Sequence, residues 1–195
     1  TALGAALFIN HQFSSEKINP MRHAYFGPKI HGDTLKKYLD HACISYNELS
    51  HVPSEIAKLL ADNKIIAWVQ GRAEFGPRAL GNRSLIADVR YDVKDTVNGI
   101  KRRQKYRPFA PAILEEFADQ YFDGPMNEYM QYTSIAKHDY APVTHVDGTA
   151  RVQVVKKDCE SIFRKVIEEY YEKTGVPMLL NTSLNIRGRP MVNDE

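Results

Sequence analysis

Apolar side chains recur along the chain at two spacings, one typical of helices and the other of strands. The strongest helical pattern is ESIFRKVIEEYYEKTG, residues 160–175, in which apolar positions return every three or four residues and Gly175 provides a C-terminal stop. In a second helix, Ser54 is the expected N-cap, and Ile56, Leu59 and Leu60 are expected to face inward. Further helices are predicted at residues 34–42, 93–100 and 115–122.

Short apolar runs between these helices predict strands. They cover residues 65–69, 84–88, 107–114, 149–155 and 176–181. In TARVQVV, residues 149–155, Val152 and Val154 are expected on one face and Arg151 and Gln153 on the other. Strands and helices interleave without a repeat period, so the predicted class is α/β or α+β with a mixed sheet.

The first residues differ from the rest of the chain. TALGAALFIN is small and apolar without an initial methionine, which predicts an element packed against another part of a longer protein. Residues 11–33 are polar and interrupted by Pro20, Gly27 and Pro28, so a surface linker is expected there.

Charge is balanced overall but concentrated locally. The net charge is +2, which excludes a global field for polyanions. Residues 71–107 nevertheless hold ten Lys or Arg against four Asp or Glu. Cys43 and Cys159 stand far apart without metal-ligand spacing, and no run resembles a membrane span or a signal peptide. A reducing, cytoplasmic location is therefore expected.

The loop GRAEFGPRALGNRS, residues 71–84, lies in this basic region. Its glycines have the spacing of a phosphate-binding loop, but Pro77-Arg78 and Asn82-Arg83 stand where a nucleotide P-loop needs Lys and Ser or Thr. Pro77 suits the first turn of a helix, and a glycine-rich junction beside arginines suits an anion. The alternative is that Arg72 and Arg83 pair with Glu74 and Asp88 on the surface.

The run KRRQKYR, residues 101–107, places five cations in seven residues. Such a run is usually solvated or bound to nucleic acid, although no RNA-binding or zinc-finger motif accompanies it. Arg107 leads into an apolar strand and Arg151 lies within one, so each guanidinium is expected to be buried with a phosphate or carboxylate partner.

Polar residues also follow the last predicted strand. Asn181, Ser183 and Asn185 in NTSLN suit a ligand at a strand end, with turn formation as the alternative. HVDG, residues 145–148, is expected to be a turn rather than a catalytic His145–Asp147 pair. The remaining histidines lack metal-ligand spacing.

Four motifs in sequence resemble one family. GRAEFGPRALGNRSLIAD, the segment from Lys101 to Leu114, THVDGTARVQVV and TGVPMLLNTSLN together resemble the C-terminal domain of the NodU-type and antibiotic O-carbamoyltransferases. The resemblance implies a YrdC-like fold, a twisted mixed sheet with flanking helices, over residues 34–195. It also implies that residues 1–33 are the end of a Kae1-like domain plus a linker, and that family members continue past residue 195.

The resemblance further implies a chemistry. The domain would convert carbamoyl phosphate and ATP, with Mg²⁺ arriving on ATP, to a carbamoyl adenylate. The Kae1-like part, which would hold iron or another metal, would then transfer the carbamoyl group to an acceptor hydroxyl. By resemblance, Lys101, Arg107 and Arg151 contact phosphates and the carbamoyl group. Binding or loop-positioning roles fall to Arg72, Arg78, Asn181, Ser183 and Asn185.

Two positions depart from the family pattern, and two other functions stay open. Leu184 replaces the usual phenylalanine, and Arg189 replaces the usual glutamate, a charge reversal beside the expected pocket. One alternative function is a noncatalytic nucleotide- or RNA-binding module, although nucleic acid is not the favoured partner. The other is an interface domain that completes the site of the Kae1-like part.

Overall fold

The computed structural model describes residues 2–14, 16, 19 and 21–192. Its centre is a five-stranded sheet in the order β1 (Ile66–Val69), β2 (Arg83–Ala87), β8 (Met178–Ser183), β3 (Ala110–Leu114), β7 (Gln153–Val155). Neighbours pair antiparallel except β3 and β7, which are parallel. The predicted α/β class with a mixed sheet is therefore confirmed.

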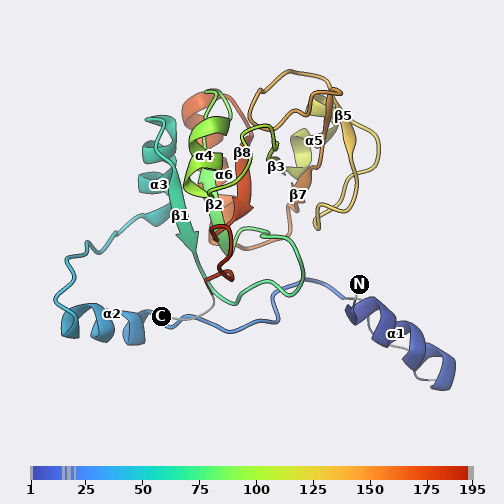
Figure 1. Ribbon diagram of the computed structural model, residues 1–195, viewed down its shortest axis with the longest axis horizontal. Coiled ribbons are helices and arrows are strands. Elements are labelled where there is room, and N and C mark those ends of the chain that lie inside the picture. The colour runs from blue at the N-terminus through green and yellow to red at the C-terminus, as the bar shows by residue number, and fades with distance from the viewer. Residues whose placement is uncertain (1, 15, 17–18, 20, 193–195) are drawn as a thin grey trace.

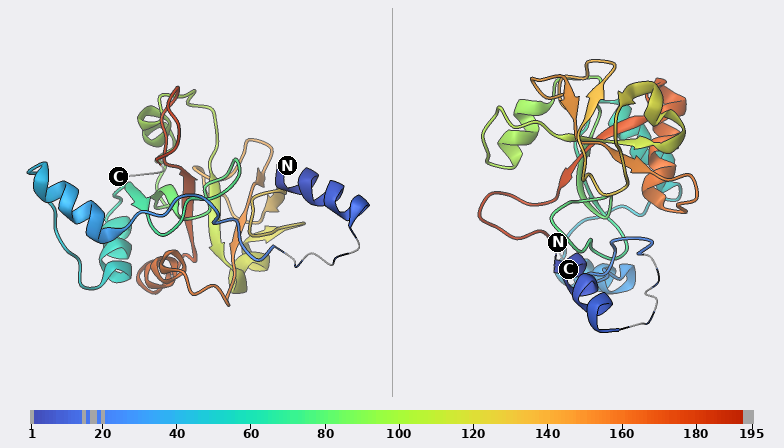
Figure 2. Two further views of the ribbon diagram at one scale, coloured as in Figure 1. Left: turned by 90° about the horizontal axis from the view of Figure 1, so that it is seen from below. Right: turned by 90° about the vertical axis from the view of Figure 1, so that its right-hand side faces the viewer.

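Helices cover both faces of this sheet. α3 (Val52–Ala61) and α6 (Ile162–Thr174) pack together on one face, and α4 (Lys94–Ile100) lies on the other, as Figures 1 and 2 show. A second sheet, with the order β4 (Phe122–Asp123), β5 (Ser134–Ala136), β6 (Thr149–Ala150), follows the short η1 (Glu115–Phe117) and α5 (Ala118–Tyr121).

Helix α6 forms as its sequence predicts. Ser161 caps it by accepting a hydrogen bond from the Arg164 backbone N–H at 3.1 Å, and Gly175 ends it with a left-handed φ of 72°. Its buried apolar stripe meets α3 and the sheet, through Phe163, Val166, Ile167 and Tyr170. Each such side chain contributes about 1.5–3 kcal/mol on burial.

The second predicted helix begins earlier than expected. α3 starts at Val52, with His51 rather than Ser54 as its N-cap and Pro53 in the first turn, where a missing N–H costs nothing. Leu59 is 39% exposed, whereas Ala57 is fully buried, because Ala57 rather than Leu59 shares the inner face with Ile56 and Leu60.

Two strand predictions need correction. TARVQVV is not one strand: it ends as β6 at Ala150 and resumes as β7 at Gln153, so the chain changes sheets at Arg151 and Val152. Val152 and Gln153 are both buried, against the predicted two-faced alternation. Strand β1 is an edge strand in which only Trp68 is buried, not the buried strand expected.

The N-terminal segment is helical, and its expected packing against another part of a longer protein stays a prediction. α1 (Ala2–Phe13) and α2 (Gly32–His41) contain no buried residue in the described part of the chain. Between them, Ala24, Gly27 and Pro28 exchange backbone hydrogen bonds with the loop that follows β1, at 2.6–2.9 Å from Ala73 and Phe75. This segment therefore runs along the β1–β2 loop (Figure 1).

Candidate functional site

Lys101 is held at the centre of a polar cluster. It caps the C-terminus of α4, and only 5% of the residue is exposed. Its Nζ donates to the backbone and side chain of both Ser183 and Asn185, including bonds of 3.1 Å to the carbonyl oxygen and Oδ1 of Asn185. Burial, and then the nearby charge of Arg103, lowers the pKa of Lys101 to about 8. The strand end and the basic run thus meet, as the two motifs predicted.

Arg103 belongs to the same cluster, although the sequence analysis did not select it. Its Nε donates to Asn98 Oδ1 at 2.5 Å, and its guanidinium lies over the Phe109 ring at 4.4 Å. Arg102 has a left-handed φ of 52°, and this turn directs Arg103 inward. Burial, followed by the charges of Arg107 and Arg151, lowers the pKa of Arg103 to about 10.

Arg103 could have been selected from the sequence by its spacing from Lys101, which matches the spacing of Ser183 and Asn185. Lys101 and Arg103 are two residues apart in the turn after α4, and Ser183 and Asn185 are two residues apart at the end of β8. Both pairs line one cavity of about 310 Å³, together with Gln104, Arg107, Ile186 and Arg187.

Arg107 lines this cavity but is exposed, so the prediction of a buried guanidinium was wrong. The reason is that β3 starts only at Ala110, and residues 107–109 lie before the sheet. The Asn98 side chain donates to the Arg107 carbonyl oxygen at 2.9 Å and fixes the backbone there. Arg107 can therefore meet a ligand without first leaving a protein partner.

Arg151 is half-buried at the break between the two sheets, and its Nε is buried without a hydrogen-bond partner among the described residues. Burial, and then the charge of Arg78, lowers its pKa. Arg78, from the glycine-rich loop, is half-buried, and within the described residues its side chain makes one long contact, 3.4 Å to the neighbouring Pro77 carbonyl oxygen. Arg151 also helps to lower the pKa of His145, after burial.

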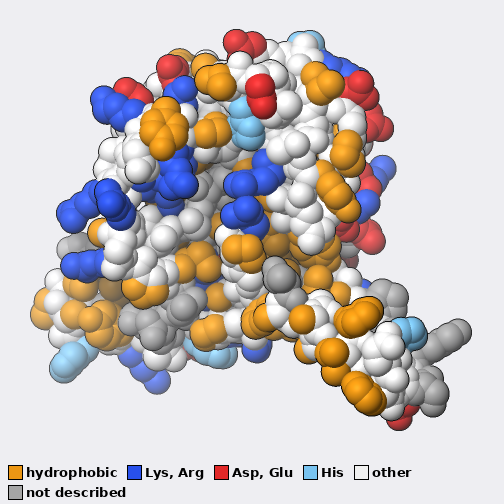
Figure 3. Space-filling model, turned by 45° about the vertical axis from the view of Figure 1, so that its right-hand side comes forward, with side chains coloured by type: hydrophobic (Ala, Val, Ile, Leu, Met, Phe, Trp, Pro, Cys, Tyr) orange, Lys and Arg blue, Asp and Glu red, His pale blue; other side chains and the backbone are white. Residues whose placement is uncertain are grey.

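Cations thus occur in the cavity lining, at the break between the two sheets and in the glycine-rich loop. Within the described residues, no Asp or Glu oxygen lies within 4.0 Å of the charged nitrogens of Lys101, Arg78, Arg103, Arg107 or Arg151. Figure 3 shows Lys and Arg side chains gathered on one face of the molecule around a hollow. Like charges repel, so the arrangement favours an anion that binds between them.

The glycine-rich loop itself has another structure than predicted. Residues 70–82 link the antiparallel strands β1 and β2, and no helix begins at Pro77. Instead the loop encloses its own Glu74, whose Oε1 accepts from the backbone N–H groups of Leu80 and Asn82 at 2.6 and 2.8 Å. The backbone N–H groups of a loop that was expected to suit an external anion thus bind the loop's own carboxylate.

The two outer arginines of this loop do not pair as the surface alternative proposed. Arg83 is fully buried and donates to the carbonyl oxygens of Gln70, Asn82, Gly71 and Pro28 at 2.7–3.3 Å. Arg72 is exposed and makes one 3.3 Å bond to the Phe26 carbonyl oxygen. Arg72 is thus placed beside the N-terminal segment, away from the cavity lining.

Asn181 was predicted to bind ligand, and the fold buries it against the glycine-rich loop. It is 1% exposed, and its Nδ2 donates to the Ala79 carbonyl oxygen at 3.2 Å and to Gln153 Oε1 at 2.7 Å. Gln153 in turn donates to the Leu80 carbonyl oxygen at 2.9 Å. These two amides support the loop, and Asn181 does not line the cavity of about 310 Å³.

HVDG forms the expected turn, closed by Gly148 with a φ of 76°.

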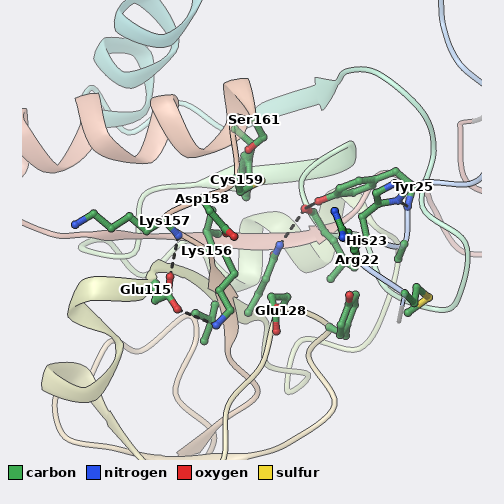
Figure 4. A pocket seen from close by; sticks show the side chains of 18 residues that line it. Arg22, His23, Tyr25, Glu115, Glu128, Lys156, Lys157, Asp158, Cys159 and Ser161 are labelled. Carbon is green, nitrogen blue, oxygen red and sulfur yellow. Dashed lines mark hydrogen bonds and ion pairs between the residues drawn. The ribbon is translucent and has the colours of Figure 1, made fainter. Parts of the chain in front are cut away.

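A larger cavity of about 800 Å³ lies between residues 21–25 and β7. Figure 4 shows Arg22, His23 and Tyr25 on one side and Glu115, Lys156 and Lys157 on the other. Glu115 accepts from Lys156 Nζ and from the Lys157 backbone N–H, both at 2.8 Å. Its charges are mixed and partly paired, whereas the smaller cavity has unpaired cations, so charge rather than size selects the candidate site.

Neither a metal cluster nor a membrane span occurs in the described part of the chain. No group of three or more His, Cys, Asp or Glu residues lies close enough to bind a metal ion there. The helices of residues 2–14, 16, 19 and 21–192 are all too short or too polar to cross a bilayer.

Comparison with known proteins identifies the family. Residues 57–195, which contain all the cations of the site, match the family described as Carbamoyltransferase C-terminus. The chain belongs to this family. It is 40% identical over 206 residues to nodulation protein NolNO of Sinorhizobium fredii, with 98% of the chain and 30% of the relative covered.

Two other relatives agree with this assignment. Nodulation protein NolO of Bradyrhizobium diazoefficiens is 37% identical over 98% of the chain and 37% of its own length. Nodulation protein U of Sinorhizobium fredii is 42% identical over 70% of the chain and 25% of its own length. The chain of this carbamoyltransferase family member thus spans about a quarter to just over a third of the relatives it matches.

Proposed function

We propose that the cationic cavity binds the phosphate groups of carbamoyl phosphate and ATP, and that the domain forms carbamoyl adenylate. The observation that carries this proposal is a set of four cations that have no carboxylate partner among the described residues, in a member of the carbamoyltransferase C-terminus family. These cations are Lys101, Arg103, Arg107 and Arg151. Ser183 and Asn185 add hydrogen-bonding groups beside Lys101.

The proposed reaction has two balanced steps. Water cleaves carbamoyl phosphate to carbamate and phosphate, and a carbamate oxygen then attacks the α-phosphorus of ATP. The new O–P bond replaces the bond to pyrophosphate, which leaves with its electron pair. The second step brings two anions together, and both steps place negative charge on phosphoryl oxygens. Preorganised cations offset that repulsion, and losing one such donor typically slows a reaction by about 10²–10³-fold.

The residues divide this work by their positions. Lys101 is fixed by Ser183 and Asn185, so it is a point charge of set location. Arg103 is fixed by Asn98 and Phe109 and presents a planar fork suited to two phosphate oxygens. Arg107 is exposed at the rim and is suited to capture the incoming ligand. None of the described residues that line the cavity carries a carboxylate, so Mg²⁺ would be held by the ATP phosphates.

The nucleic-acid alternative fits the arrangement less well. Lys101 and Arg103 of KRRQKYR turn inward, and Lys105 pairs with Asp95 at 3.1 Å on the outside. The run does not present a continuous cationic surface to a polyanion.

Cys43 and Cys159 are both free thiols, which supports the cytoplasm as the proposed location.

Calorimetric titration of the chain with carbamoyl phosphate, and separately with ATP, tests the binding step. We expect Arg103→Ala to lower the affinity for each ligand by at least about ten-fold, because a fixed cation is lost. Lys105→Met is the matched control, since it removes a charge from the same segment outside the cavity. Equal affinities for the unmodified chain and Arg103→Ala would contradict the proposed site.

A further inference from the structure

The loop that carries Arg78 is fastened around a buried carboxylate. Glu74 is 6% exposed, and its Oε1 accepts three backbone N–H groups, from Leu80, Asn82 and Arg83 at 2.6, 2.8 and 3.4 Å. Its Oε2 is buried without a hydrogen-bond partner among the described residues. An ionised carboxylate makes stronger bonds to amides than a neutral acceptor does. Glu74 therefore joins the first part of the loop to the backbone of residues 80–83 at its end.

Arg78 sits inside the segment that this carboxylate closes. The residues directly after it are also fixed from below, since Asn181 donates to the Ala79 carbonyl oxygen and Gln153 to that of Leu80. Gln153 lies only two residues from Arg151. The same short segment thus supports the loop and carries Arg151.

Arg78 has no comparable support of its own. Within the described residues, its side chain makes one 3.4 Å contact, with the Pro77 carbonyl oxygen. The bond from Gln153 to Leu80 brings the segment of Arg151 beside the segment of Arg78, whose charge helps to lower the pKa of Arg151 after burial. Without a bound anion these two guanidinium groups repel each other. A loop that was free to move would separate them, so their approach depends on how the loop backbone is held.

We propose that Glu74 is a positioning residue, which fixes the glycine-rich loop so that Arg78 and Arg151 together contact one phosphate group. This inference rests on the proposed function of the cationic cavity, and assigns the loop a part in it. The loop does not cradle the ligand with its amides. It uses those amides on an internal carboxylate and offers the ligand a guanidinium instead.

A double-mutant cycle with inorganic pyrophosphate as the probe tests the assignment. Affinity is measured by calorimetry for the 195-residue chain, Glu74→Gln, Arg78→Ala and the double variant. Glu74→Gln keeps an acceptor at Oε1 but loses the charge, so we expect about five- to ten-fold weaker binding. In the Arg78→Ala background we expect Glu74→Gln to have no further effect, because it acts through Arg78. Glu55→Gln, an exposed charge loss on α3, is the control.

Several results would overturn the inference. Unchanged affinity in Glu74→Gln, or the same loss with and without Arg78, would show that Glu74 does not act through Arg78. If Glu74→Gln does not fold, Gln153→Met removes the support at Leu80 instead, and the same dependence on Arg78 is expected.

Lys101→Met separates this inference from the proposed function. If Lys101→Met weakens pyrophosphate binding but Glu74→Gln does not, the inference fails alone. If the unmodified chain and Lys101→Met bind pyrophosphate equally, the cavity is not the anion site and both fail.

Discussion

The titration of Lys101 gives the anion site a pH signature. Burial and the charge of Arg103 lower the pKa of this lysine to about 8. Lys101 is therefore about nine-tenths charged at pH 7 and about one-tenth charged at pH 9. If the charged form is needed for binding, the affinity for an anion of fixed charge falls as pH rises through this range. The expected change is roughly ten-fold between pH 7 and pH 9, or about 1.4 kcal/mol.

Sulfate is a suitable probe because its own charge does not change in this range. Calorimetry at constant ionic strength between pH 7 and pH 9 measures the affinity of the unmodified chain, Lys101→Met and Lys105→Met. We expect the pH dependence to disappear in Lys101→Met, which binds weakly throughout. It should persist in Lys105→Met, whose lysine is exposed and paired with Asp95. An affinity that is flat with pH in the unmodified chain, or an equal slope in Lys101→Met, would refute this reasoning.

Four further substitutions test particular contacts. Arg103→Lys should weaken pyrophosphate binding about as much as Arg103→Ala in calorimetry, because lysine cannot reproduce the planar fork over Phe109; full retention of affinity would contradict this. Arg83→Met should lower the free energy of unfolding by about 3 kcal/mol or more in urea melts, since it leaves buried carbonyl oxygens unpaired. Arg72→Ala should lower it by less than about 0.5 kcal/mol, because Arg72 is exposed and makes a single long bond. Similar costs for these two arginines would show that burial does not decide their roles. Gly81→Ala should lower the melting temperature strongly, because its Cβ would lie 2.3 Å from the Phe163 ring at a φ of 102°; an unchanged melt would refute the close packing.

The sequence predicted those parts of the fold that depend on local periodicity. Helix α6 and strand β8 were found because apolar spacing and Gly175 act within a few residues. The break at Arg151 was missed, since alternation in TARVQVV does not reveal that its halves belong to different sheets. The helix expected at Pro77 was wrong because the direction of β2 relative to β1 is set by pairing rather than by local sequence.

The candidate site was predicted in part for the same reason. Lys101, Ser183 and Asn185 lie together, as their motifs indicated. Arg103 was missed because its inward direction depends on the left-handed turn at Arg102, a conformation that arginine seldom adopts. Asn181 lies in the expected motif, but its side chain faces the loop, and only the fold shows this. The binding roles of these residues stay predictions.

Pyrophosphate release tests the central claim most directly. The chain is incubated with ATP and Mg²⁺, with and without carbamoyl phosphate, beside Lys101→Met and the control Lys105→Met. The account predicts release that requires carbamoyl phosphate, falls by about 10²-fold or more in Lys101→Met and is retained in Lys105→Met. Release that does not depend on carbamoyl phosphate, or that is unchanged in Lys101→Met, would contradict it.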